Sequence, residues 1–81
     1  MILEISRGRV RAQIGVKTAT VEGEGYLKGH GSPDFVLYRN SIRTWDPPHD
    51  PDVIDDATRE SILSTIKAEM QSEKGMTVEV E

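Results

Sequence analysis

The chain has 81 residues, of which 36% are hydrophobic, and it carries a formal net charge of −4 with no cysteine. Disulfides, thiolate zinc sites and thiol nucleophiles are therefore excluded. With one Trp, two Tyr and one Phe, such a chain can build a single small core, which favours a binding protein or an oligomer over a self-contained enzyme.

The charge is unevenly distributed along the chain. Residues 1–43 contain seven Lys or Arg and four Asp or Glu, whereas residues 44–81 contain three and ten. An acidic balance argues against general nucleic-acid binding and favours a basic partner, because summed charge steers association. The start, "MILEISRGRV", has no basic leader before a long apolar run. No apolar run approaches the length of a membrane span, so we expect a soluble, cytoplasmic protein.

The first half of the chain consists of short alternating segments separated by glycine turns, which is typical of an antiparallel meander. The segments expected to form strands are 2–6, 9–15, 16–23, 26–28 and 34–42. The last of these has apolar residues on both faces, so we expect a central strand that is covered on both sides.

Alternation assigns the faces of each strand, because successive strand side chains point to opposite sides of a sheet. In the first segment it places Leu3 and Ile5 on one face. In the second it places Val10, Ala12 and Ile14 on one face.

A helix is expected over residues 55–74. Asp55 is its N-cap, since a carboxylate there can accept from free backbone N–H groups. Gly75 suits the left-handed conformation that often ends a helix. Four apolar side chains recur at helical spacing and should form one buried stripe, namely Ile62, Leu63, Ile66 and Met70.

Residues 76–81 alternate again, with Met76, Val78 and Val80 on one face. The fold class is α+β: an antiparallel β-meander with one C-terminal helix packed on the sheet and a final short strand. We expect a single domain, 1–81, made of a β-rich segment over 1–43, a proline loop 44–54, the helix 55–74 and the strand 76–81.

Two features could suggest nucleotide or acid–base chemistry. Segment 23–33, "GEGYLKGHGSP", has neither the dinucleotide nor the Walker spacing, so hairpin turns are favoured over phosphate binding. His30 and His49 lie in turn-like segments with no partner that would make either a general base. We expect no catalytic residue and no cofactor.

Residues 43–56, "RTWDPPHDPDVIDD", contain the only Trp and three of the four Pro. Asp46, His49, Asp50 and Asp52 could be ligands of a metal, but they lack the glycine and glutamate of a calcium loop. Three prolines also restrict how these side chains could converge. A turn is favoured, and no metal site is expected.

Trp45 has two interpretations. It could anchor a partner, since Trp is enriched in interface hot spots. It could instead cap one end of the core, which we favour because a domain with so few aromatic residues needs its largest one inside.

A basic stripe runs along the second strand, formed by Arg7, Arg9 and Arg11 with Lys17. RNA-binding sheets place aromatic residues among such charges, and none lies between these arginines. A solvated face or ion pairing with the acidic half is favoured. A small nucleic-acid-binding module that uses Arg7, Arg9 and Arg11 is the alternative function.

The order of "MILEI", a glycine-rich meander, "PDFVLYRNSIRTWDPPHD", "RESILSTIK" and "GMTVEVE" resembles a family of small bacterial proteins. These are the predicted immunity proteins of polymorphic toxin systems, in the group numbered 74. The resemblance extends over nearly the whole chain, and its most specific block is 34–50. It implies a non-enzymatic protein that neutralises a cognate toxin in the cytoplasm by binding it. It transfers no site residues.

The acidic half of the chain would suit a basic toxin such as a nuclease. We expect Asp46, Asp50 and Asp52 to turn outward, whereas Asp55 is already accounted for as a cap. The candidate partner-binding residues are Trp45, Asp46, Asp50, Asp52 and Asp56. No membrane partner is expected, and a homo-oligomer is left open.

Overall fold

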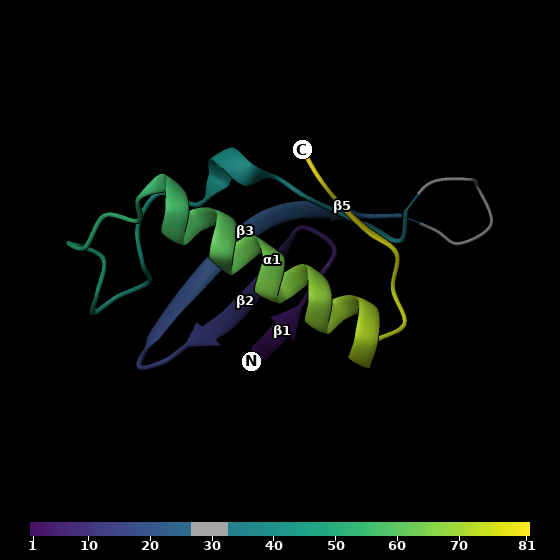
Figure 1. Ribbon diagram of the computed structural model, residues 1–81, viewed down its shortest axis with the longest axis horizontal. Coiled ribbons are helices and arrows are strands. Elements are labelled where there is room, and N and C mark those ends of the chain that lie inside the picture. Colours follow the sequence, from purple (N-terminus) through teal and green to yellow (C-terminus); the bar gives the residue numbers. More distant parts are fainter. Residues whose placement is uncertain (27–32) are drawn as a thin grey trace.

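The computed structural model describes residues 1–26 and 33–81. A five-stranded sheet has the order β1-β2-β3-β4-β5, and helix α1 crosses one of its faces (Figure 1). The first four strands pair antiparallel in sequence order, and β5 pairs parallel to β4. The α+β fold predicted from the sequence is confirmed. The strands are β1 (Ile2–Ile5), β2 (Arg9–Ile14), β3 (Lys17–Gly25), β4 (Phe35–Leu37) and β5 (Val78–Val80).

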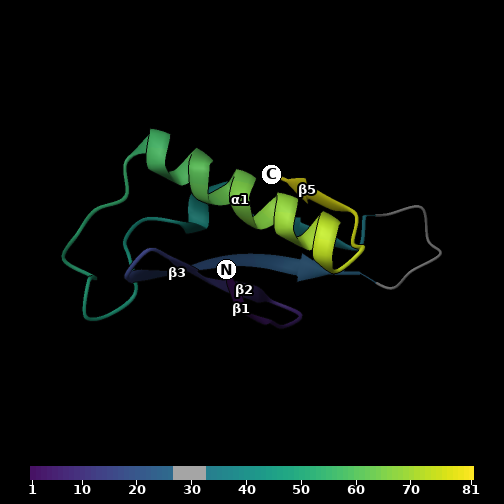
Figure 2. The same cartoon turned by 60° about the horizontal axis from the view of Figure 1, so that its bottom comes forward.

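Helix α1 (Asp56–Glu73) begins and ends as the sequence predicts. The Asp55 side chain accepts a hydrogen bond from the Thr58 amide at 2.7 Å, and Gly75 has a φ of 64°. The predicted stripe of four apolar residues is buried against the sheet, where it contacts the inward side chains of the strands. Figure 2 shows this helix above one face, while the other face carries no helix in the described part of the chain.

The predicted facing of the first strand is wrong, because a β-bulge interrupts it. Ile2 pairs with Ala12 and Glu4 pairs with Arg11, so β1 has one more residue than its partner over this stretch. A bulge shifts the alternation by one residue. As a result Ile2 and Ile5 both pack against the core, whereas Leu3 is 44% exposed.

The predicted strand 34–42 is shorter than expected. Its strand part is β4, which is buried along its whole length, and a 3₁₀ helix, η1 (Arg39–Ser41), follows. The Ser41 hydroxyl donates to the Tyr38 carbonyl at 2.7 Å and accepts from the Glu22 amide at 2.9 Å. The Ser41 hydroxyl thus takes the place of a direct backbone hydrogen bond from the Glu22 amide to the Tyr38 carbonyl. The chain turns away from β3 here, and Ile42 then packs in the core.

Strand β3 is longer than predicted and runs to Gly25, while Tyr26 lies just beyond it. The rest of the predicted segment 26–28 and His30 lie outside the described residues. At Gly23, β3 lies close against β4. A Cβ there would overlap the Val36 carbonyl oxygen and the Phe35 ring, so only glycine fits this pairing.

Candidate functional site

The proline loop is closed at its base and anchored in the core. Thr44 and Val53 form an isolated antiparallel bridge, and the Ile54 amide donates to the Arg43 carbonyl at 3.0 Å. Trp45 is only 8% exposed and belongs to the core, which confirms the favoured interpretation of this residue. Its buried ring therefore fixes the position of the first residues of the loop against the core.

Asp46 is the first loop carboxylate, and it turns toward the sheet. Its amide donates to the Thr18 carbonyl at 2.8 Å, and its carboxylate accepts from the Thr20 hydroxyl at 2.8 and 3.0 Å. One carboxylate oxygen lies 3.9 Å from the Arg11 Nε, and the side chain is 24% exposed. The expectation that Asp46 turns outward is wrong, because β4 pairs only with the end of β3 and leaves the Thr18 edge free for this residue.

The other loop and helix-start carboxylates are exposed, and two of them form ion pairs within the chain. Asp52 lies 3.0 Å from the Lys17 Nζ, and Asp56 lies 2.6 Å from an Arg59 guanidinium nitrogen. Asp50 is exposed and forms no ion pair with the described residues. The structure thus leaves Asp50 as the proline loop's uncompensated aspartate.

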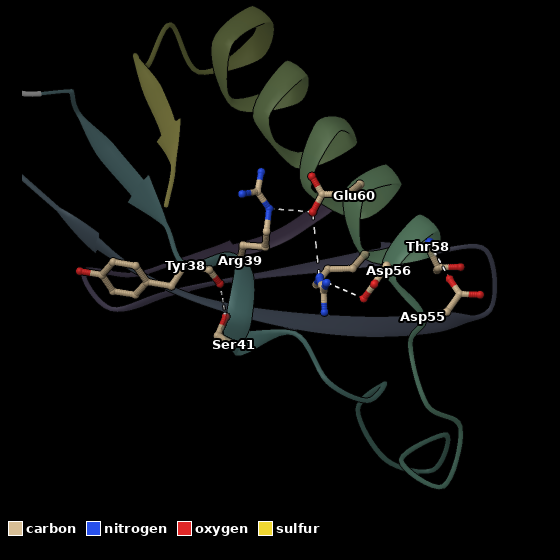
Figure 3. Close-up of polar contacts among 8 residues, drawn as sticks. Tyr38, Arg39, Ser41, Asp55, Asp56, Thr58 and Glu60 are labelled. Atoms are coloured by element: carbon tan, nitrogen blue, oxygen red, sulfur yellow. Dashed lines mark hydrogen bonds and ion pairs between the residues drawn. The ribbon is translucent and has the colours of Figure 1, made fainter.

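A charged network joins η1 to the start of α1 (Figure 3). The Arg39 Nε donates to Glu60 at 2.7 Å, and Glu60 also lies 4.0 Å from the Nε of Arg59. Beside it, the hydrogen bond from the Thr58 amide lowers the pKa of the Asp55 carboxyl. These charges hold the helix start in place and are largely balanced among themselves.

A second acidic region lies on the face of the sheet that α1 leaves open. In register, Glu24 of β3, Val36 of β4 and Glu79 of β5 are neighbours across three strands. The next row follows the same order, because the Tyr38 amide donates to the Glu22 carbonyl and the Glu81 amide donates to the Leu37 carbonyl, both at 2.8 Å. We call this region the acidic sheet face and define it as Glu22, Glu24, Tyr26, Tyr38, Glu79 and Glu81.

Two tyrosines share one carboxylate at the centre of this face. The hydroxyls of Tyr26 and Tyr38 donate to the same Glu24 oxygen at 3.2 and 3.1 Å. The hydrogen bond and charge of Glu24 raise the pKa of Tyr38, and partial desolvation followed by the same carboxylate raises the pKa of Tyr26. Both hydroxyls are therefore held as protonated donors, and their positions are fixed from one point.

The carboxylates of this face differ from those of the loop in their pairing. Glu22, Glu24, Glu79 and Glu81 form no ion pair with any described residue. The nearest basic neighbour in the register is Arg9, which stands opposite Glu22. None of these six residues was among the predicted contacts, although the alternation of Glu22, Glu24 and Tyr26 is a detectable signal of one polar strand face.

The basic stripe of the sequence does not form an isolated patch. Arg11 lies beside Asp46, and Arg9 stands opposite Glu22. His49 is partly exposed, and its amide donates to the Asp46 carbonyl at 2.9 Å within the loop turn, where the Pro47–Pro48 peptide is cis. No group of three or more His, Cys, Asp or Glu side chains suited to a metal occurs among the described residues.

Comparison with known families gives a match. The family described as Immunity protein 74 matches residues 2–81, which is nearly the whole chain. The chain belongs to the Immunity protein 74 family. The resemblance noted in the sequence is thereby confirmed, and membership implies an immunity protein that acts against a toxin. No curated protein and no solved structure matches the chain.

In the described part of this Immunity protein 74 member, no helix is long and apolar enough to cross a membrane. Helix α1 instead buries one stripe and exposes the rest of its surface.

Proposed function

We propose that this protein is a non-enzymatic inhibitor that binds a cognate toxin in the cytoplasm of the bacterium that makes both and neutralises it through an acidic surface. The observation that carries the proposal is the match to Immunity protein 74 over residues 2–81. The two acidic surface regions and the net charge of −4 support it.

The physical reason for an acidic surface is the chemistry of the partner. A toxin that cleaves nucleic acid needs basic residues to bind phosphates, so its active cleft attracts carboxylates. An acidic inhibitor is drawn to such a cleft by long-range charge, and it can cover the residues that would bind the nucleic acid. We therefore propose a basic nuclease as the toxin.

The proline loop supplies one candidate contact surface. Asp50 and Asp52 are its exposed carboxylates, and Asp56 adds a 90% exposed carboxylate at the start of α1. Trp45 and Asp46 contribute to this surface mainly indirectly, because they hold the loop in its position.

Co-expression tests the function directly. The toxin encoded beside this gene should stop growth when it is expressed alone, and this protein should restore growth. The two purified proteins should also form a stable complex. A toxin that remains lethal beside the folded inhibitor would contradict the proposal.

A further inference from the structure

In the part of the chain that the structure describes, no helix packs on the acidic sheet face. Helix α1 packs on the opposite side of the sheet (Figure 2). Tyr26 is 40% exposed and Tyr38 is 36% exposed, and they flank Val36, which is 2% exposed. Tyrosine offers a large contact area for little loss of side-chain freedom, which is why it is enriched in binding surfaces.

The face is also preorganised. One Glu24 oxygen receives both tyrosine hydroxyls, so the two rings are positioned before any partner arrives. Backbone pairing fixes the strands beneath, with Val36 opposite both Glu24 and Glu79. Little conformational entropy is therefore lost when a partner binds here, because these side chains are already ordered.

The charge of the face identifies the kind of partner. Neighbouring strands are about 5 Å apart, so the glutamates of β3 and β5, which have β4 between them, lie about 10 Å apart. None of the four glutamates forms an ion pair with a described residue. Like charges at this spacing repel one another, and cationic groups would relieve the repulsion. Arginine is the best match, because its guanidinium pairs with carboxylates and stacks on aromatic rings.

We propose that the acidic sheet face, rather than the proline loop, is the surface that docks the toxin, and that the toxin presents arginine and lysine side chains to it. This inference rests on the proposed function. It adds where the inhibitor is bound and which chemistry the toxin offers there.

Two charge reversals of equal size test the inference. E79K/E81K changes the acidic sheet face, and D50K/D52K changes the proline loop. Each raises the formal net charge from −4 to zero. Association with the toxin encoded by the adjacent gene is measured by surface plasmon resonance at low salt. We expect E79K/E81K to slow association about tenfold or more, and D50K/D52K to slow it by less than about threefold.

The outcomes distinguish a failure of this inference from a failure of the proposed function. Equal slowing by both variants would mean that net charge alone acts, and greater slowing by D50K/D52K would place the contact on the loop, so either result overturns the inference. A wild-type protein that does not bind the toxin would overturn the proposed function itself. Circular dichroism checks the fold of each variant. E79Q/E81Q, compared with D50N/D52N, replaces the lysine pair if that pair does not fold.

Discussion

The proline loop and the acidic sheet face are both negatively charged, but they differ in how far their carboxylates are paired within the chain. In the loop, Asp46 contacts Thr20 and Arg11, and Asp52 pairs with Lys17. On the sheet face, Glu24 holds two tyrosine hydroxyls, and no glutamate pairs with a described cation. An acidic segment in a sequence is thus not by itself an available acidic surface.

Backbone pairing explains this difference. The sheet face is built on strands whose amides and carbonyls already pair with one another, so its side chains are free for other contacts. The loop instead passes the edge of β3 that β4 leaves unpaired, where the Asp46 amide donates to the Thr18 carbonyl. Its polar groups are needed to hold the loop against that edge.

Replacing Trp45 with alanine should have the largest effect on stability. The ring is buried at the base of the loop, so W45A should lower the free energy of unfolding by roughly 3–5 kcal/mol, as measured by urea denaturation. The fraction that remains folded should still bind the toxin. If W45A instead kept its stability and lost binding, Trp45 would be an interface anchor and the loop would be the docking surface.

Replacing Gly23 with alanine should disrupt the base of the acidic sheet face. The added methyl group would meet the Val36 carbonyl and the Phe35 ring, at a cost of about 1–3 kcal/mol or more in unfolding free energy. The matched control is G8A, since a Cβ at Gly8 would meet nothing within 4 Å. Thermal melting should separate the two variants. Equal stabilities would contradict the close approach of β3 and β4.

Removing both tyrosine rings should weaken binding without unfolding the protein. Y26A/Y38A should raise the Kd for the toxin by about 10- to 100-fold, because exposed aromatic anchors carry much of an interface's energy. Isothermal titration calorimetry measures this change. V53A is the control on the proline loop, where the valine is 78% exposed, and its Kd should match the wild type. A larger effect of V53A would reverse the comparison of the two regions.

The smallest expected effect concerns the tyrosine hydroxyls. E24Q removes the charge that they share, so the pKa of both tyrosines should fall toward the ordinary value of 10.0, with the greater change at Tyr38. Absorbance of the phenolate during a pH titration measures this. In the wild type, the raised pKa stabilises the fold below about pH 10, and this contribution is lost as the pH rises through the folded-state pKa. Unchanged titration in E24Q would contradict the shared hydrogen bonds.

Local signals in the sequence were sufficient for much of the fold. Helix α1 was predictable because Asp55, Gly75 and the apolar stripe are local signals, each of which acts on residues only a few positions away. The bulge beside Leu3 was not, because alternation assumes an uninterrupted ladder. The turn at Ser41 depends on a hydrogen bond to Glu22, 19 residues away, which no local pattern contains.

The candidate site was harder to predict for the same reason. Asp46 looked exposed beside two prolines, but its partners Thr20 and Arg11 come from β3 and β2. The acidic sheet face combines the end of β3, the residue after β4 and the last strand. Only the pairing of these strands brings Glu24 and Glu81 near Tyr38.

Chemical modification of the tyrosines tests the central claim most directly. Tyr26 and Tyr38 are the only two tyrosines in the chain, so nitration by tetranitromethane, read by peptide mass spectrometry, reports on the acidic sheet face alone. Saturating the protein with its toxin should protect both rings, while salt high enough to dissociate the complex should restore their reaction. Nitration of both tyrosines at the free rate in the intact complex would show that the toxin binds elsewhere.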